Sequence, residues 1–209
     1  MNREYRGVAE IMERVIFLDR DGTLNEEVNY LHRKEDLVLL PGVAQALAML
    51  KRAGYRLVVV TNQAGVARGY YGEDEVVRLH EYMNELLAPQ GAQIDHFFYC
   101  PHHPEHGIGA YKKVCHCRKP ETGMFEMAEQ YYEIDKEASW MIGDKKIDVE
   151  AGRNYGVHTI LVGTGYGSEE RVKAEENLPE GGSCPWDFYA DTLLEAAEQI
   201  LEKGTETEI

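Results

Sequence analysis

Residues 15–23 read Val-Ile-Phe-Leu-Asp-Arg-Asp-Gly-Thr, and this stretch decides the fold. The apolar run predicts a buried strand over Val15 to Asp19, as in a parallel sheet. Asp19 and Asp21 then emerge at the carboxyl end of that strand, where open α/β sheets bind ligands. Their two-residue spacing lets both side chains face one cleft, and Gly22 lets the chain turn away. The stretch therefore predicts an acidic site at one edge of a parallel sheet.

The carboxylate pair has several interpretations when it is taken alone. It offers a nucleophile, a general acid or base, and oxygen ligands for magnesium. It is equally compatible with a solvated turn, or with a pair of residues that only binds a metal ion. Asp-x-Asp by itself does not separate these possibilities.

Apolar runs and segments with helical periodicity alternate along the rest of the chain. Further strands are predicted over Arg56 to Thr61, His96 to Cys100, Ser139 to Gly143 and His158 to Val162. Helices are predicted over Val43 to Ala53, Asp74 to Leu87, Met124 to Tyr132, Ile147 to Tyr155, and from a cap at Asp191 to Lys203, with Gly204 to Ile209 as a frayed tail. This alternation is typical of an α/β fold, a Rossmann-like parallel sheet with helices on both faces.

The length of 209 residues fits one domain, residues 1–209. Two long connections interrupt the alternation, Leu24 to Leu40 and Pro101 to Pro120, and connections of that length are usually functional or need another source of order. No segment between the motifs is long enough for a large cap domain. The cleft is therefore expected to be covered only by these two connections.

Composition excludes several functions. Apolar residues make up 44% of the chain, and no uninterrupted apolar stretch approaches the ~20 residues that cross a bilayer. The segment from Met1 to Arg14 lacks the apolar core of a secretory signal, so a cytoplasmic location is expected. The protein is also expected to be a monomer. The net charge of −15 argues against nucleic acid and anionic membranes as partners. An anionic substrate would then need a site made locally positive by a metal or a few placed cations.

Three further strand or loop ends carry polar groups. Thr61 and Asn62 follow the second strand, where a hydroxyl and backbone N–H groups can hold phosphate oxygens. Lys119 offers a cation just before a helix, and Asp144 and Asp148 follow the fourth strand. Each of these is, on its own, more often a turn residue, a helix cap or a solvated charge.

Their order along the chain resembles that of the haloacid dehalogenase superfamily, from Val15 to about Val162. The resemblance implies that Asp19 attacks phosphorus, and that Asp21 protonates the leaving oxygen and then activates water. It implies that Thr61 and Lys119 bind the transferring phosphoryl group. Magnesium would be held by the Asp19 carboxylate, the Asp21 backbone carbonyl and Asp144.

Two other positions refine that expectation. Asp148 is expected to orient a metal ligand or the lysine from behind. An acidic residue at position 21 favours a phosphatase or phosphotransferase over a dehalogenase, and a non-catalytic phospho-ligand binding module would have no use for this acid.

The loop that follows the third strand contains a possible metal site. Cys100, His102, Cys115 and Cys117 form a C-x-H…C-x-C arrangement that suits tetrahedral zinc with no open position, hence a structural site over residues 100–117. The alternatives are unrelated reduced cysteines, or ligation by His103, His106 or His116. Cys184 is expected to be a free thiol.

These motifs narrow the resemblance to the branch that contains heptose-bisphosphate and histidinol-phosphate phosphatases. The resemblance implies a small phosphorylated sugar as substrate, cleavage of the 7-phosphate of heptose 1,7-bisphosphate in nucleotide-activated heptose biosynthesis, and Arg118 as the residue that binds the phosphate that is not transferred. Histidinol phosphate is the alternative substrate, and a phosphorylated nucleic-acid end is disfavoured by the acidic charge. The segment at 27–30 departs from the pattern of the best-known members, which have Gly at the position of Asn29. The substrate-binding residues implied are Asp19, Arg20, Asp21, Glu27, Val28, Asn29, Tyr30, Thr61, Asn62, Gln63, Ala64, Arg118 and Lys119.

Overall fold

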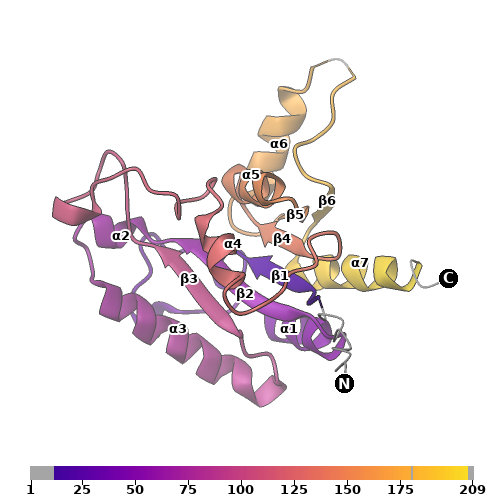
Figure 1. Cartoon of the computed structure of the whole chain (residues 1–209), viewed down its shortest axis with the longest axis horizontal. Coiled ribbons are helices and arrows are strands. Elements are labelled where there is room, and N and C mark those ends of the chain that lie inside the picture. Colours follow the sequence, from indigo (N-terminus) through magenta and orange to yellow (C-terminus); the bar gives the residue numbers. More distant parts are fainter. Residues whose placement is uncertain (1–11, 180, 207–209) are drawn as a thin grey trace, which may run out of the picture.

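The computed structural model describes residues 12–179 and 181–206. Six parallel strands form one sheet in the order β3-β2-β1-β4-β5-β6 (Figure 1). The strands are β1 (Val15–Leu18), β2 (Arg56–Asn62), β3 (His96–Cys100), β4 (Trp140–Gly143), β5 (His158–Val162) and β6 (Phe188–Ala190). The chain leaves β1 toward β2 on one side and returns to β4 on the other, so the strand order reverses between β1 and β4. That reversal is where open parallel sheets bind their ligands.

Helices cover both faces of the sheet. Helices α1 (Val43–Arg52), α3 (Glu73–Leu87) and α7 (Leu193–Glu206) contribute to the larger core with Ile16 and Leu18 of β1. Helices α4 (Gly123–Ala128) and α5 (Lys146–Tyr155) contribute to the opposite core with Val15 and Phe17. The alternation of side chains along β1 thus supplies both cores, as the period of a strand requires.

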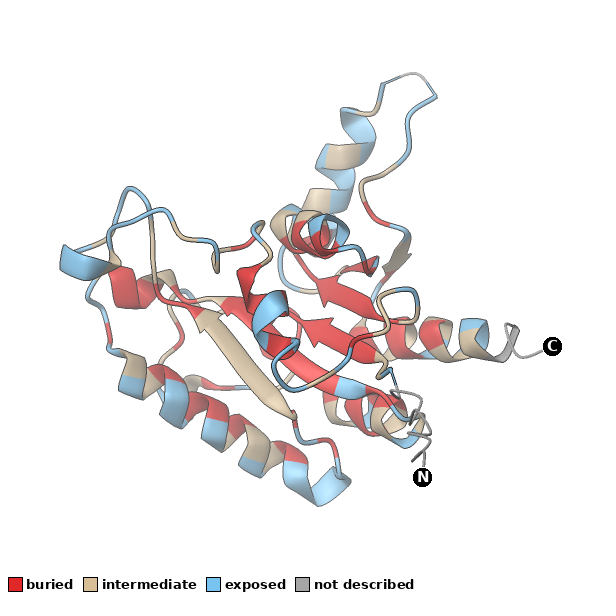
Figure 2. Ribbon diagram, viewed as in Figure 1, coloured by how far each residue is buried: buried red, intermediate tan, exposed pale blue. Residues whose placement is uncertain are grey.

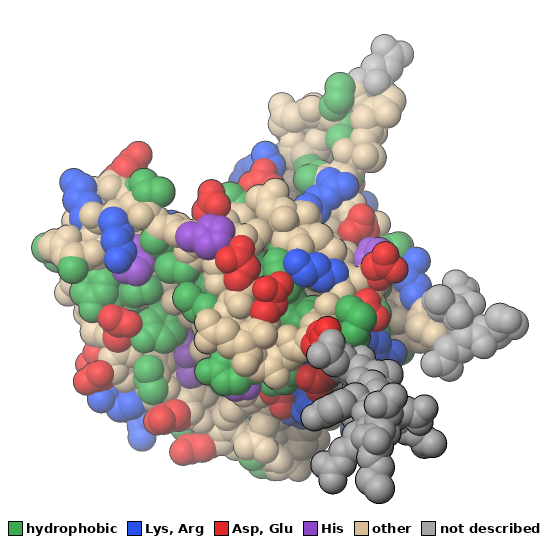
Figure 3. Space-filling model, viewed as in Figure 1, with side chains coloured by type: hydrophobic (Ala, Val, Ile, Leu, Met, Phe, Trp, Pro, Cys, Tyr) green, Lys and Arg blue, Asp and Glu red, His purple; other side chains and the backbone are tan. Residues whose placement is uncertain are grey.

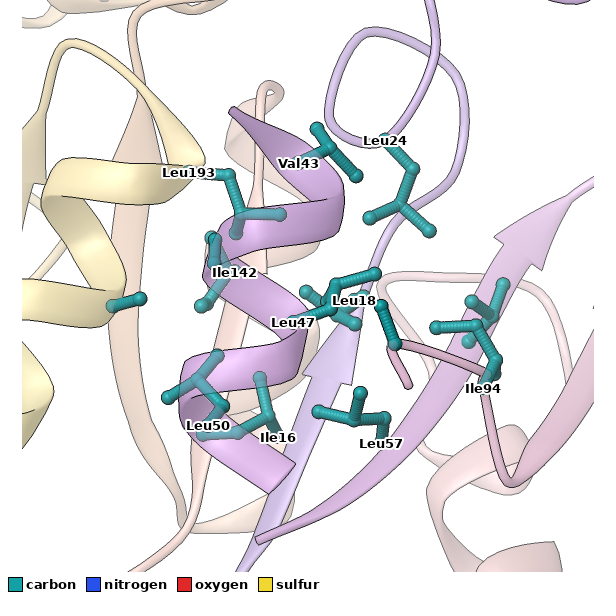
Figure 4. Packing of buried hydrophobic residues seen from close by; sticks show 14 of the residues in the cluster. Ile16, Leu18, Leu24, Val43, Leu47, Leu50, Leu57, Ile94, Ile142 and Leu193 are labelled. Atoms are coloured by element: carbon teal, nitrogen blue, oxygen red, sulfur yellow. The ribbon is translucent and has the colours of Figure 1, made fainter. Parts of the chain in front are cut away.

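The larger core also anchors the connection that follows β1. Leu47 and Leu50 of α1 pack toward Ile16 of β1, and Leu24 enters the same layer from the connection (Figure 4). Leu24 is fully buried. Truncating a buried leucine of this kind to alanine costs ~2–5 kcal/mol of stability. Apolar packing therefore fixes the start of the segment that carries Glu27 to Tyr30.

Burial is uneven across the sheet. The central strands β1 and β4 are buried throughout, whereas four of the five residues of the edge strand β3 are half-buried (Figure 2). Helix α6 (Gly167–Glu176) projects from the sheet together with the segment that leads to β6 (Figure 1). Its charged residues are exposed except for the half-buried Glu170, and it buries only its first residue, Gly167.

The fold confirms the predicted α/β class, the five predicted strands and the predicted helix positions within a few residues, with corrections at three places. The helix predicted over Met124 to Tyr132 ends at Ala128 and continues as turns. The strand β6 and helix α6 were not predicted, because three residues are too short for a period and α6 has no apolar stripe.

The start and end of the last helix also differ from the prediction. The hydroxyl of Thr192, and not Asp191, accepts the hydrogen bond from the N–H of Glu195 at 3.2 Å. The helix runs through Gly204 to Glu206, so the predicted tail begins later than expected. The remaining residues 207–209, like residues 1–11 of the predicted N-terminal segment, lie outside the described part of the chain.

Among the described residues, no helix is both long and apolar enough to cross a bilayer. Acidic and basic side chains are interspersed over the face drawn in Figure 3.

Candidate active site

Asp19 lies immediately beyond the carboxyl end of β1, next to the end of β4. Its backbone N–H donates to the carbonyl of Ile142 at 2.9 Å, which continues the β1–β4 ladder by one residue. The chain then turns at Gly22, whose φ of 84° is in the left-handed region. A Cβ at this position would collide with the carboxylate of Asp144. Glycine therefore allows the turn after β1 to approach the end of β4.

Lys119 lies between two carboxylates. Its Nζ is 2.7 Å from an oxygen of Asp19 and 2.7 Å from an oxygen of Asp148, and its side chain is 1% exposed. Asn62, at the end of β2, holds the backbone of Lys119 on both sides: its Oδ1 accepts from the Lys119 N–H at 3.0 Å, and its Nδ2 donates to the Lys119 carbonyl at 3.1 Å. Asn62 thus fixes the direction from which the lysine enters the site.

The charges in this cluster act strongly on one another. Burial alone would lower the pKa of Lys119, but the charges of Asp148 and Asp19 raise it above its ordinary value. Burial, with the charges of Asp19 and Asp148, raises the pKa of Asp144 to about 8. The site therefore holds more negative charge than its lysine neutralises.

Asp21 is held by four hydrogen bonds. Arg20 donates to both of its oxygens, from Nε at 3.1 Å and from Nη2 at 2.8 Å. Asn25 donates to the first oxygen at 3.0 Å, and Gln63 donates to the second at 3.1 Å. Burial would raise the pKa of Asp21, but the charge of Arg20 and these hydrogen bonds bring it below its ordinary value. Asn25 was not recognised in the sequence, because a lone asparagine in a turn carries no motif.

Three buried carboxylates fit a divalent cation. One oxygen each from Asp19, Asp144 and Asp148 lies within 4.8 Å of the others. Oδ1 of Asp144 is buried and has no hydrogen bond in the described structure. Oδ1 of Asp148 is also buried and accepts no described hydrogen bond, and its partner is Nζ of Lys119 in the ion pair given above. A hard cation with oxygen ligands, such as Mg²⁺, suits this donor set. Asp19 and Asp144 were predicted as ligands, whereas Asp148 was predicted as a supporting residue and its contact with Lys119 agrees with that.

A pocket of about 280 Å³ opens beside Asp19. It brings together ten of the predicted residues, namely Asp19, Asp21, Glu27, Asn29, Tyr30, Thr61, Asn62, Gln63, Ala64 and Lys119. The prediction missed five lining residues as substrate contacts: Tyr71, Lys145, Ile147, Asp148 and Tyr166. Tyr166 follows β5 in a loop with no motif, and its N–H donates to Asp144 Oδ2 at 2.9 Å.

Three predicted substrate residues do not line this pocket. The side chain of Arg20 is fully buried behind Asp21, and Val28 packs against the larger core. Arg118 donates from Nη1 to the carbonyl of His102 at 3.1 Å. Lys145 takes a place in the pocket wall instead, with its Nζ 2.8 Å from Glu27 and 3.8 Å from Asp144.

The Cys/His loop forms a second cluster. The sulfur atoms of Cys100, Cys115 and Cys117 lie 3.2–3.3 Å from one another, and Nδ1 of His102 lies 3.8 Å and 3.6 Å from those of Cys100 and Cys117. None of these cysteines forms a disulfide. The hydrogen bond between Cys117 and Cys100 is the largest of the effects that lower the pKa of the Cys117 thiol to about 5. Three thiols and one imidazole at this spacing fit tetrahedral zinc.

The other loop histidines are engaged elsewhere. Nδ1 of His103 accepts from two backbone N–H groups, those of Glu105 at 3.1 Å and His106 at 3.0 Å. His116 lies 2.9 Å from the carboxylate of Glu126. The structure therefore groups His102, and not these two, with the cysteines.

Residues 116–196 match the family described as HAD-hydrolase-like, which agrees with the class of protein that the parallel sheet and the acidic site define. A D-glycero-beta-D-manno-heptose-1,7-bisphosphate 7-phosphatase of Vibrio cholerae is 46% identical over 160 residues, 76% of this chain and 86% of that protein. A D-glycero-alpha-D-manno-heptose-1,7-bisphosphate 7-phosphatase of Burkholderia mallei is 45% identical over 149 residues, 71% of this chain and 79% of that protein.

Solved structures give the same result. The D,D-heptose 1,7-bisphosphate phosphatase of B. bronchiseptica, complexed with magnesium and phosphate, superposes with a TM-score of 0.76 at 33% identity over 91% of this chain and 99% of that one. The chain therefore belongs to the heptose-1,7-bisphosphate 7-phosphatase family of haloacid dehalogenase-like phosphatases.

Proposed function

We propose that this protein hydrolyses the 7-phosphate of D-glycero-D-manno-heptose 1,7-bisphosphate through a phospho-aspartate on Asp19. The observation that carries the proposal is the convergence of Asp19, Thr61 and Lys119 on one pocket, beside a cluster of under-neutralised carboxylates. Relatives at 45–46% identity are named for this activity on one anomer or the other. We place the reaction in the cytoplasm, in a monomer, ahead of nucleotide activation of the heptose.

The chemistry follows from the positions of the side chains. A carboxylate oxygen of Asp19 forms a bond to phosphorus while the bond from phosphorus to the sugar oxygen breaks. The ammonium of Lys119 and the hydroxyl of Thr61 contact the equatorial oxygens, which carry the spread charge of the transition state. Asp21, which is ionised beside Arg20 in the structure, must first take up a proton when substrate binds, and it gives this proton to the departing sugar oxygen. The resulting Asp21 carboxylate then takes a proton from the water that attacks phosphorus, which releases phosphate and restores Asp19.

Magnesium suits the acidic cluster. Asp19 and Asp144 would hold it with the backbone carbonyl of Asp21, and it would neutralise charge on the phosphoryl oxygens. Asp148, paired with Lys119 at 2.7 Å, keeps the lysine directed at Asp19. The raised pKa of Asp144 supports this assignment, because a cation would relieve the repulsion that raises it.

The second phosphate of the substrate needs its own cations. Arg118 stands outside the pocket wall, and the pKa of the nearby His103 is lowered by burial and by the charges of Arg118, His106 and Arg68. Arg68 lies over the ring of Tyr30, 5.8 Å from its centroid, and its Nε is buried without a hydrogen bond in the described structure. Since Tyr30 lines the pocket, we assign the 1-phosphate to Arg118 and Arg68 at its outer rim.

We assign structural zinc to the Cys/His cluster. Cys117 is two residues from Lys119, and the carbonyl of the proposed ligand His102 accepts a hydrogen bond from Arg118. The metal would therefore fix the loop that presents both cations.

A phosphate-release panel tests the function. It contains both anomers of heptose 1,7-bisphosphate, histidinol phosphate and a phosphorylated oligonucleotide, each with excess magnesium. We expect a heptose bisphosphate to have the highest kcat/KM. Asp19→Asn should abolish release from every substrate without lowering the melting temperature, because the amide is nearly isosteric but not a nucleophile. Faster turnover of histidinol phosphate than of either heptose bisphosphate would overturn the substrate assignment. Phosphate release by Asp19→Asn would overturn the mechanism.

A further inference from the structure

Arg20 is an unusual buried cation because its guanidinium has no exposure to solvent. Its carboxylate partner is Asp21, the residue assigned above to protonate the sugar oxygen. A guanidinium has five N–H donors in one plane and accepts no hydrogen bond, so each of its nitrogens needs an acceptor when it is buried. The acceptors around Arg20 therefore decide where it lies, and with it where Asp21 lies.

His80, in the middle of α3, supplies one of these acceptors. Its Nε2 lies 3.3 Å from Nη1 of Arg20. Because arginine can only donate, Nε2 must be unprotonated and His80 neutral, with its proton on Nδ1. Burial, with the charge of Arg20, lowers the pKa of His80 well below its ordinary value, in agreement with this state.

The imidazole is held in place by packing. It stacks on Phe97 of β3 with ring centroids 4.4 Å apart and an angle of 15° between the planes. His80 is 5% exposed and does not line the pocket. Among the described hydrogen bonds of its side chain, the one with Arg20 links it to the site.

A second contact closes the arrangement. Oε1 of Gln63 accepts from Nη2 of Arg20 at 3.1 Å and from the hydroxyl of Tyr71 at 2.9 Å, while its Nε2 donates to Asp21 and to Thr61. Arg20, Asp21 and Gln63 thus form a closed ring of hydrogen bonds. Within the described part of the chain, His80 is the side chain that accepts a hydrogen bond from Nη1 of Arg20. Removing His80 would therefore leave this buried N–H donor without an acceptor.

We propose that His80 is a positioning residue for Asp21: as a neutral acceptor on α3, it fixes the guanidinium of Arg20, which in turn holds the carboxylate that protonates the leaving oxygen. The inference rests on the proposed role of Asp21 as the acid, and it does not depend on which sugar is the substrate.

The test compares two phosphate esters that differ in their need for the acid. Glycerol 3-phosphate, a primary alkyl ester, releases an alkoxide that must be protonated, whereas p-nitrophenyl phosphate releases a stable phenolate. His80→Phe keeps an aromatic ring on Phe97 but has no acceptor. We expect it to lower kcat/KM about tenfold or more for glycerol 3-phosphate and less than about threefold for p-nitrophenyl phosphate, the first loss being a part of the ~10²–10⁴-fold that a positioned acid contributes.

Two further variants separate positioning from packing. His80→Gln restores an acceptor at a similar reach and should recover most of the activity on glycerol 3-phosphate, although it lacks the ring. Met83→Leu changes a buried side chain one turn along the same helix and should affect both esters equally. If His80→Phe is recovered unfolded, His80→Leu provides the same comparison with a smaller apolar side chain.

Equal losses on the two esters in a folded His80 variant, or no loss on either, would overturn the proposal. So would a failure of His80→Gln to recover activity where His80→Phe has lost it. Absence of phosphate release from any ester by the wild-type protein would instead count against the proposed function, so the two failures are distinguishable.

Discussion

At the scale of single residues, the site depends on one lysine that serves two buried acids. Lys119 contacts Asp19 and Asp148 at 2.7 Å each, with all three side chains at most 8% exposed. A buried ion pair adds little net stability by itself, but removal of one partner leaves a charge without compensation. The same ammonium thus holds the site together and, in the proposed mechanism, also binds the phosphoryl group.

Lys119→Met should therefore lower both stability and activity. We expect the free energy of unfolding to fall by ~3–5 kcal/mol, because two buried carboxylates lose their cation, and phosphate release to fall to background. The matched control is Lys146→Met, an exposed lysine on α5 that pairs only with Glu150 at 3.3 Å among the described ion pairs. The free energy of unfolding of Lys146→Met should stay within ~0.5 kcal/mol of the wild-type value. Urea unfolding at pH 7 provides the comparison, and equal stability of the two variants would contradict the argument.

At the scale of elements, two connections rather than the regular elements complete the site. The connection after β1 is anchored in the larger core by Leu24, and the loop after β3 carries the cluster of Cys100, His102, Cys115 and Cys117. Few apolar side chains of this second loop are buried, and Val114 and Ile108 are 85% and 60% exposed. We therefore expect the proposed zinc site to contribute much of its order.

Metal analysis of the purified protein should find about one zinc per chain, as four ligands without an open position imply. Cys117→Ser should lose the zinc, and amide exchange across residues 101–120 should become faster. Substrate binding should weaken with it, since Arg118 and Lys119 belong to the loop. Cys184→Ser is the control, because Cys184 lies outside the cluster and should retain full zinc content. Zinc-free protein with unchanged exchange would argue against a structural metal.

The cap of α7 offers a sharper test of an element boundary. Thr192 accepts from the N–H of Glu195, whereas the neighbouring Asp191 only donates its backbone N–H to the Glu195 carboxylate at 2.8 Å. Thr192→Ala should lower the free energy of unfolding by ~1 kcal/mol, the usual effect of losing an N-cap, and Asp191→Ala should lower it much less. Thermal unfolding of the two variants measures the difference, and the reverse order of stabilities would restore Asp191 as the cap.

At the scale of the whole molecule, an acidic protein must receive an anionic substrate. The net charge is −15, and the cluster of Asp19, Asp144 and Asp148 adds local negative charge at the pocket. Lys119 and Lys145 offset part of it. A bound divalent cation would make the site attractive to phosphate and would also relieve repulsion in the folded state.

This relief should appear in the pH dependence of stability. The pKa of Asp144 is raised in the folded protein from 3.8 to about 8, so between these values the folded state binds a proton that the unfolded state has released. For metal-free protein, this group makes stability fall as pH rises through that window. Magnesium should remove this loss, because it favours the ionised carboxylate.

Magnesium should therefore raise the melting temperature more at pH 8 than at pH 5. The two increases should differ by at least about 3 °C for a chain of this size. Desalted protein, with and without excess magnesium, provides the measurement without a chelator that would also attack zinc. Asp144→Asn cannot ionise and should reduce the pH dependence of the gain, leaving the part that comes from Asp148, whose pKa burial raises to about 6. A gain that is equal at both pH values in the wild type would be inconsistent with the acidic cluster as the magnesium site.

The sequence by itself determined the fold class and the main chemical groups of the site. Apolar runs separated by helical periods gave five of the six strands, because burial on both faces forces such runs in a parallel sheet. Asp19 and Asp144 could be found because each directly follows a strand, and Thr61 because it lies at the end of one. Lys119 could be found because it stands with Pro120 shortly before a helix. The zinc cluster could be found because its ligands come in close pairs along the chain.

Only the tertiary structure decided which side chains face the pocket. Arg20 was expected to contact substrate, but its side chain lies behind Asp21 and is paired with His80, which is 60 residues away in the sequence. Asn25, Lys145 and Tyr166 carry no motif and enter the site because separate loops meet at the ends of β1, β4 and β5. Helix α6 has no apolar stripe and was therefore invisible to periodicity. The local sequence pattern predicts which residues are buried and where the chain turns. The direction of a polar side chain depends instead on hydrogen-bonding and charged partners that are brought close only when the sheet and its loops pack together.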